Sequence, residues 1–170
     1  EYRRQRQMCI RDRSSYHVFA VATVHGVRSY QDSWIGSSNQ GICTPDSYAG
    51  WWPLAWKYNG GNPQMTVGHY TYQHRSLVVT GSNLSLNTPV LLETWFDGSY
   101  IRCSVGAALP ESLDAGNINS EILNNHGLLI AEPGSFSGSL GTLLICNQAL
   151  NETDRASVRQ YLGTKYGVAY

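Results

Sequence analysis

Two carboxylates, Glu93 and Asp97 in the stretch ETWFD, lie close enough in the sequence to consider glycoside hydrolysis. That reaction needs one carboxyl group as acid and a second as nucleophile or base, held several ångströms apart. No third acid follows, and Asp97 precedes Gly98 in a dipeptide typical of hairpin turns. Two isolated carboxylates of this kind are more often solvated surface or turn residues, so the pair does not predict catalysis.

The aromatic cluster YAGWWPLAWKY is the stronger candidate for a binding site. Sugar rings present flat apolar faces, and Trp or Tyr rings are suited to stack on them. Trp51 and Trp52 precede Pro53 in an expected loop, while Trp56 follows at strand spacing with the same parity as Trp52. The alternative is that the residues of this parity pack between sheets. The ligand-binding candidates are Trp51, Trp52, Tyr48 and Tyr58.

Metal and cysteine chemistry have weaker support. His69 and His74 are five residues apart, which places them on opposite faces of a regular strand. Calcium ligands can be named by residue type only, without an acidic ladder: Asp46, Asp97 and Asp114. We therefore expect no cofactor and no catalytic residue, with calcium as the alternative. Cys103 and Cys146 lie in apolar stretches that predict small buried side chains.

The elements that must position these residues are mostly short strands. Strand-like runs recur along the chain and are separated by Gly-, Pro- and Asn-containing turns, which is typical of a sandwich or barrel. The first run is 16–24, and the clearest hairpin is 89–106 with Asp97-Gly98 at its turn.

The C-terminal tail has a different pattern and predicts one amphipathic helix. Asn151 is a good N-cap, and Gly167 supplies the stop. Val158, Leu162 and Tyr166 recur every four residues and form one apolar stripe.

The basic N-terminal stretch, residues 3–13, carries five of the 12 Lys and Arg residues. The string RRQRQMCIRD is similar to one reading frame of a sequencing-library adapter. We therefore expect residues 1–13 to be a non-native, disordered segment and residues 14–170 to be a single domain lacking its first strand or strands. From Ser14 onward, 7 Lys and Arg face 10 Asp and Glu, about −3 in net charge. This charge does not support a nucleic-acid partner, and no apolar run is long enough to span a membrane.

The tail also carries a family resemblance. The stretch 134–168 resembles the C-terminal signature of LamG-like, concanavalin A-like lectin/glucanase jelly rolls, in which a Gly-rich turn, a last strand and a terminal helix follow one another. The matching residues are Gly138, Leu143, Leu144, Ile145, Asn147, Ala149, Leu150, Arg155, Tyr161, Leu162, Lys165, Tyr166 and Gly167. The runs 16–24 and 89–109 are similar to an early core strand and a hairpin of the same family. Thr142 and Cys146 depart from it, standing where an acid and a tyrosine are common.

The resemblance implies an all-β fold, an antiparallel jelly-roll sandwich with one C-terminal helix. It also implies a non-catalytic recognition or adhesion module of a larger bacterial or phage surface protein, joined to other domains and binding a carbohydrate or a protein. Its location would be extracellular, on a cell surface or on a virion. Two alternatives stay open: a glycoside hydrolase or its accessory domain, and a purely structural phage or virion domain. Hydrolases of this architecture use an E-x-D-x-x-E strand, and only Glu93 and Asp97 lie within reach of such a pattern.

Overall fold

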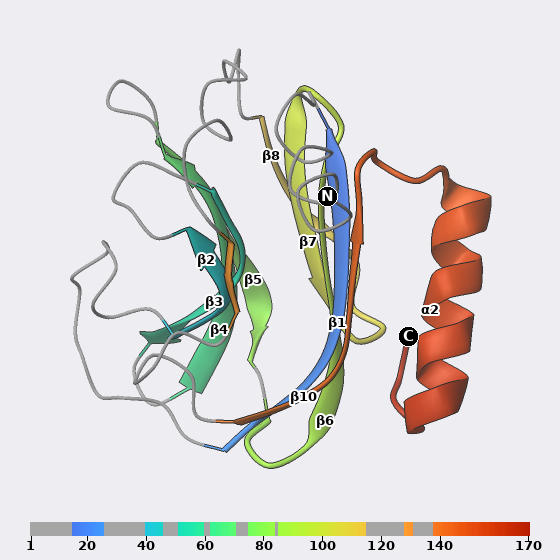
Figure 1. The fold of residues 1–170 in the computed structure, drawn as a ribbon. Helices are drawn as coiled ribbons and strands as arrows, with labels where there is room; N and C mark the ends of the chain where they lie inside the picture. Colours follow the sequence, from blue (N-terminus) through green and yellow to red (C-terminus); the bar gives the residue numbers. More distant parts are fainter. Residues whose placement is uncertain are drawn as a thin grey trace, which may run out of the picture.

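The computed structural model describes residues 15–25, 40–45, 51–59, 62–70, 75–83, 85–114, 128–130 and 138–170, with side chains in 15–25, 85–114 and 138–170. These residues form a β-rich body and one helix (Figure 1). The strands are β1 (Tyr16–Val24), β2 (Gln40–Pro45), β3 (Trp51–Asn59), β4 (Asn62–Tyr70), β5 (Arg75–Asn83), β6 (Pro89–Phe96), β7 (Tyr100–Val105), β8 (Glu111–Asp114), β9 (Leu128–Ile130) and β10 (Gly138–Cys146). The helix is α2 (Glu152–Tyr166).

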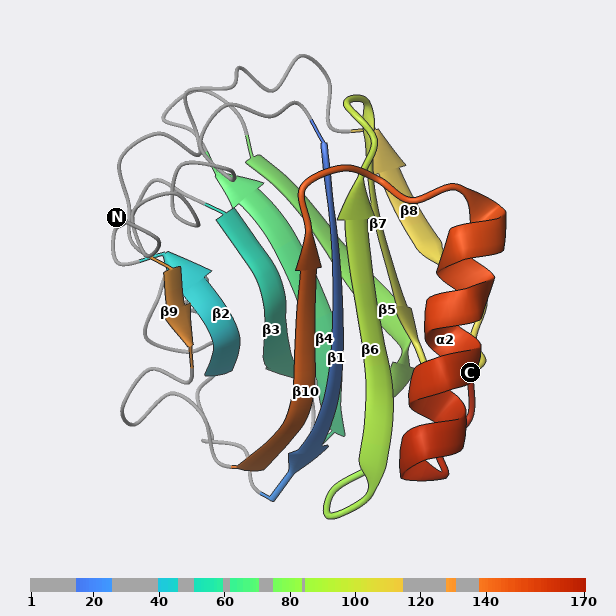
Figure 2. The same cartoon turned by 45° about the vertical axis from the view of Figure 1, so that its right-hand side comes forward.

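The strands form two antiparallel sheets of five strands each. The first has the order β10-β1-β6-β7-β8, and the second has the order β5-β4-β3-β2-β9. Figures 1 and 2 show the second sheet on one side of the first and α2 on the other side. The helix therefore covers the face of the first sheet that is turned away from the second sheet.

Strand β1 is buried on both of its faces, which explains its nearly continuous apolar sequence. Phe19 and Val21 pack with Leu162 of the helix in one hydrophobic cluster. Val18 and Ala20 alternate with them, point to the opposite face, and are fully buried. The predicted run 16–24 is thus confirmed as a central strand between β10 and β6.

Helix α2 begins and ends where the sequence predicts. The Asn151 side chain accepts a hydrogen bond of 2.9 Å from the Asp154 backbone N–H, which caps the first turn. Gly167 adopts the left-handed conformation at φ 65°, and the Val168 N–H donates to the Gly163 carbonyl at 3.1 Å. Among the residues that the structure describes, no helix is long and apolar enough to cross a membrane.

The helix packs closely because β10 has a glycine where α2 approaches it. The register of β10 against β1 shifts at Gly141, between the pairs Val21–Thr142 and Ala22–Leu140. A Cβ atom at Gly141 would lie 2.8 Å from the Tyr166 ring, so any larger residue would force this ring to shift. The Tyr166 hydroxyl also hydrogen-bonds the Thr142 hydroxyl. Thr142, which departs from the family pattern, therefore has a packing role here.

The 89–106 hairpin is confirmed, but its turn lies one residue further along than predicted. The Asp97 N–H donates to the Tyr100 carbonyl at 3.3 Å, which leaves Gly98 and Ser99 as the two central residues. Gly98 has φ 102°, the conformation that a type II′ hairpin turn requires at its first central position. Asp97 instead accepts the N–H groups of Ser99 and Tyr100 with its side chain.

Candidate functional site

The most densely connected polar site of the described residues surrounds the buried carboxylate of Glu93. Its Oε1 atom accepts hydrogen bonds from His17 Nε2 at 2.8 Å and from Arg155 Nε at 2.6 Å. Its Oε2 atom accepts from Ser104 Oγ at 3.0 Å, from Arg155 Nη2 at 3.0 Å and from Arg159 Nη1. We call these five residues, Glu93, His17, Ser104, Arg155 and Arg159, the Glu93 cluster.

Sheet register and helix periodicity bring the Glu93 cluster together. Glu93 on β6 lies opposite Ser104 on β7, and it also lies opposite Phe19 on β1, beside His17. Arg155 and Arg159 are four residues apart on α2 and so project from the same side of the helix. The cluster therefore joins three strands to the helix, over sequence separations of up to 76 residues.

The carboxylate stays ionised in spite of its burial. Burial acts to raise the pKa of Glu93, but the hydrogen bonds from His17 and Arg155 and the positive charge of Arg155 outweigh it. Together they lower the pKa from 4.5 to about 2. Arg159 adds a second guanidinium, which also donates to the Gly106 carbonyl at 2.7 Å. Five donors occupy the carboxylate, so it has no free lone pair with which to take a proton from a substrate.

His17 is fixed within the Glu93 cluster by hydrogen bonds at both ring nitrogens. Its Nδ1 atom accepts the Leu150 N–H at 3.2 Å, so the ring proton lies on Nε2 and is donated to Glu93. The ring stacks between Phe19, at 4.4 Å between centroids, and Trp95, at 5.1 Å. The interpretation of Glu93 as a solvated residue is therefore wrong: Glu93 and His17 are both 0% exposed.

Asp97, the second acid of the suggested catalytic pair, belongs to a different environment. It is exposed, and it forms an ion pair with Arg102 in addition to its two turn hydrogen bonds. Burial slightly opposes ionisation, but the hydrogen bond from the Tyr100 N–H and the contact with Arg102 lower the pKa of Asp97. The structure thus separates the two acids by role: Glu93 fixes the helix to the sheet and Asp97 closes a turn.

Three of the four aromatic candidates lie on β3, in the sheet that does not carry the helix. Trp51, Trp52 and Tyr58 belong to this strand, and Tyr48 lies outside the described residues. The expectation that Trp51 and Trp52 lie in a loop is wrong, because β3 begins at Trp51 and pairs it with His69.

The parity argument for these tryptophans also needs correction. The register between β3 and β4 shifts between Trp52 and Ala55, the segment that contains Pro53. Proline has no N–H to donate to a ladder, so an irregularity at this point is expected within a strand that is paired on both sides. Strict alternation therefore does not run from Trp52 to Trp56. Which of the two neighbouring tryptophans contacts a ligand stays a prediction.

His69 lies on β4 and Cys43 lies on β2, without described side chains, whereas His74 and Asp46 lie outside the described residues. Asp114 ends β8, an exposed edge strand that the sequence analysis did not predict. Within the described residues, no three His, Cys, Asp or Glu side chains gather as a metal site.

Cys103 and Cys146 are free thiols that burial makes unreactive. Cys103 is fully buried, as predicted, and Cys146 is half-buried. Burial, followed by the negative charge of Glu111, raises the pKa of the Cys103 thiol to about 12. Burial also raises the pKa of Cys146. Because the thiolate is the reactive form, neither residue is suited to nucleophilic chemistry.

Comparison with known proteins adds no assignment. No protein-family model matches the chain, and no curated protein matches it.

Sequence reasoning did not find the Glu93 cluster. His17 has no partner at a motif-like spacing, and its contacts come from residues far along the chain. One signal was available: a glutamate in an otherwise apolar strand, VLLETWF, needs a buried cation if that strand is central. The two arginines four residues apart on an amphipathic helix are the matching half of that signal.

Proposed function

We propose that residues 14–170 form a LamG-like, concanavalin A-like jelly-roll β-sandwich that acts as a recognition module and does not cleave glycosidic bonds. Its ligand is a carbohydrate or a protein, and it belongs to a larger bacterial or phage protein on a cell surface or virion. The two antiparallel five-stranded sheets and the helix that follows the last strand support this assignment. The tail residues of the resemblance that the structure describes also support it, because Leu162, Tyr166 and Gly167 dock or cap that helix.

The observation that carries the proposal is the placement of β3 relative to α2. The helix occupies the outer face of the sheet that contains β1 and β6. The aromatic strand β3 lies in the other sheet, away from the helix. A recognition surface that includes Trp51 or Trp52 would therefore not compete with helix docking.

The assignment as a binding module rather than a glycosidase follows from the two acids already described. Retaining and inverting glycosidases both require two carboxyl groups that face one substrate. Glu93 is sealed beneath the helix by five donors, and Asp97 is committed to a turn. No specific observation favours a purely structural role.

The proposal is tested by glycan titration monitored through tryptophan fluorescence. Trp51→Ala should abolish ligand-dependent quenching while it leaves the far-UV circular dichroism spectrum unchanged. Trp95→Phe is the matched control: it also removes one of the five tryptophans, but beneath the helix, and binding should persist. A wild-type protein that binds no glycan on an array and no protein partner would overturn the proposal. Release of reducing sugar would favour the hydrolase alternative.

A further inference from the structure

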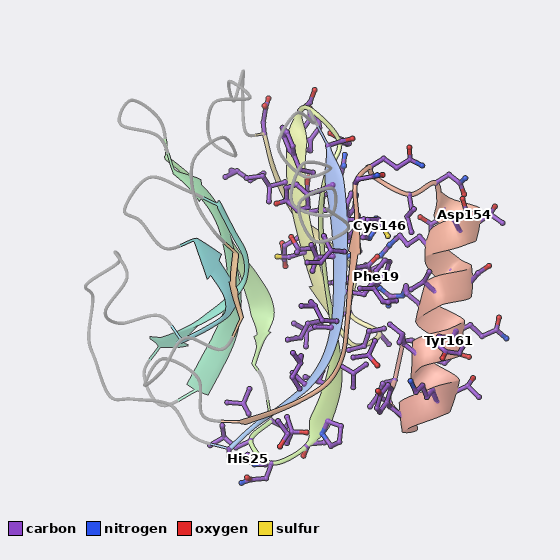
Figure 3. The ribbon with its side chains drawn as sticks, viewed as in Figure 1. Phe19, His25, Cys146, Asp154 and Tyr161 are labelled. Atoms are coloured by element: carbon purple, nitrogen blue, oxygen red, sulfur yellow. The ribbon has the colours of Figure 1, made fainter. Side chains whose placement is uncertain are left out.

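Three polar side chains meet at the end of β1 that is distant from the Glu93 cluster. His25 Nδ1 lies 3.0 Å from Asn87 Oδ1, and His25 Nε2 lies 3.0 Å from Ser139 Oγ. All three residues are exposed to solvent. Figure 3 shows His25 at one end of the first sheet, far from Asp154 in the first turn of helix α2. We call these residues the His25 cluster.

The central position of β1 explains why the three residues meet. Its last residues pair with β6 on one side and with β10 on the other, through Thr23 with Pro89 and Thr23 with Ser139. His25 follows directly after the strand and so lies between the turn that enters β6 and the first residues of β10. Two segments 52 residues apart in the sequence are thereby brought to one imidazole ring.

Asn87 is held in place by its backbone as well as by its side chain. It has φ 60°, in the left-handed region that asparagine adopts more readily than most residues. Its N–H donates to the Val24 carbonyl at 2.7 Å, immediately before His25. The amide oxygen of Asn87 is therefore fixed at hydrogen-bond distance from Nδ1.

The partner atoms of the two ring nitrogens suit His25 to act as a base toward Ser139. The Asn87 amide oxygen can only accept, so the proton of the neutral ring lies on Nδ1. Nε2 then has a lone pair that accepts the Ser139 hydroxyl proton. A serine, a histidine and an acceptor that orients the ring form the arrangement that activates a nucleophile.

We propose that Ser139 is a nucleophilic serine that accepts acyl groups from carboxylic esters. Ser139 Oγ attacks the ester carbonyl carbon while its proton moves to His25 Nε2. The bond from that carbon to the alcohol oxygen then breaks, and the alcohol leaves with the proton from His25. Water, deprotonated by the same nitrogen, releases the carboxylic acid and restores the serine. Asn87 is a positioning residue, because it acts through the ring of His25.

This reaction differs from the recognition role proposed above and does not depend on it. An imidazole base contributes about 10²- to 10⁴-fold to a reaction of this kind. We therefore expect Ser139 to react at least about 100-fold faster than an exposed serine without a histidine partner. Ser112, on the exposed strand β8, provides that internal comparison.

The test uses an alkyl fluorophosphonate, in which serine attack forms an O–P bond, fluoride leaves and His25 takes the proton. The intact protein is labelled, and peptide mass spectrometry compares the rates at Ser139 and Ser112. Release of p-nitrophenol from p-nitrophenyl acetate, compared between the wild type and Ser139→Ala, measures turnover. Preferential labelling of Ser139 with Ser139-dependent turnover supports the proposal. Equal labelling of the two serines overturns it.

Substitutions of the two partners separate activation from simple hydrogen bonding. His25→Gln keeps a donor and an acceptor but no basic nitrogen, so labelling of Ser139 should fall about 100-fold with an unchanged thermal midpoint. Asn87→Gly keeps the left-handed backbone and should slow labelling, whereas Asn87→Asp retains an acceptor and should restore it. Labelling of Ser139 at the wild-type rate in His25→Gln would show that the His25 cluster only connects the turn before β6 to the ends of β1 and β10. If His25→Gln does not fold, Asn87→Gly and Asn87→Asp decide by the same criterion.

Discussion

The two ends of β1 each carry a histidine with both ring nitrogens in hydrogen bonds, and the two rings are arranged in opposite ways. His17 is fully buried, accepts at Nδ1 from a backbone N–H, and donates from Nε2 to Glu93. His25 is exposed, donates from Nδ1 to Asn87, and accepts at Nε2 from Ser139. The histidine within β1 is therefore a fixed donor to a carboxylate, whereas the histidine that follows β1 turns an accepting nitrogen toward an exposed hydroxyl.

Burial decides what each of these polar clusters can do. In the Glu93 cluster every acceptor site is occupied and the groups lie beneath a helix, so loss of one member leaves the others unpaired in a poorly solvated place. In the His25 cluster, water can replace any lost partner at little cost. The first arrangement stabilises the fold, and the second leaves its reactive atoms accessible.

The largest expected effect is the loss of Glu93. Glu93→Ala leaves His17, Ser104 and two guanidinium groups without their shared acceptor, which should lower the free energy of unfolding by about 3–5 kcal/mol. Urea unfolding measures the change. Glu152→Ala is the control, because the Glu152 side chain is 81% exposed and its ion pair with Arg155 should contribute less than about 1 kcal/mol. A Glu93 effect no larger than this control would contradict the conclusion that Glu93 fixes the helix to the sheet.

Acid should weaken the same cluster with a defined sign. The pKa of Glu93 is lowered to about 2 in the folded state, so its contribution is fully present above pH 4.5 and is lost as the pH falls toward 2. The shift corresponds to about 3 kcal/mol. Measured from pH 6 to pH 2, the difference in unfolding free energy between the wild type and Glu93→Gln should shrink by about that amount. A difference that does not change with pH would mean that Glu93 is not charged in the folded protein.

Helix docking also has an apolar half, which separates packing from charge. Leu162 is fully buried against Phe19, Val21 and Leu91. Leu162→Ala should lower the free energy of unfolding by about 2–4 kcal/mol, because it leaves a cavity between the helix and the sheet that neighbouring side chains fill only in part. Thermal or urea unfolding measures the change. Tyr161→Ala on the exposed side of the same helix is the control and should change stability by less than about 0.5 kcal/mol. An effect under about 0.5 kcal/mol at Leu162 would mean that charge alone holds the helix.

Local signals in the sequence were sufficient for most of the structure near α2 and β1. The cap at Asn151, the stop at Gly167 and the stripe through Leu162 all depend on residues within one or two helical turns. The strand at 16–24 could be predicted because a strand buried on both faces is apolar along nearly its whole length.

The Glu93 cluster and the His25 cluster could not be predicted from the sequence, because they depend on strand register and on contacts between distant segments. Glu93 meets Arg155 across 62 residues, and His25 meets Ser139 across 114. No spacing rule predicts which residue lies opposite which before the sheet order β10-β1-β6 is known. The short strand β8 was missed for a simpler reason: all four of its residues are exposed, so it has no hydrophobic pattern. The segment 1–13 lies outside the described residues, and its exclusion stays a prediction.

The smallest expected effect on the free energy of unfolding is that of replacing His25, and the same substitution at His17 provides the comparison. His25→Gln should change the free energy of unfolding by less than about 0.5 kcal/mol, because both of its partners are exposed and can bond to water. His17→Gln should cost about 1–3 kcal/mol, since it disturbs a buried hydrogen bond to Glu93 and a ring stacked between Phe19 and Trp95. Parallel urea titrations of the two variants give both values under one condition. If His25→Gln destabilises as much as His17→Gln, the His25 cluster is a structural tie, and the hydrogen bond between Ser139 and His25 is explained without a reaction at Ser139.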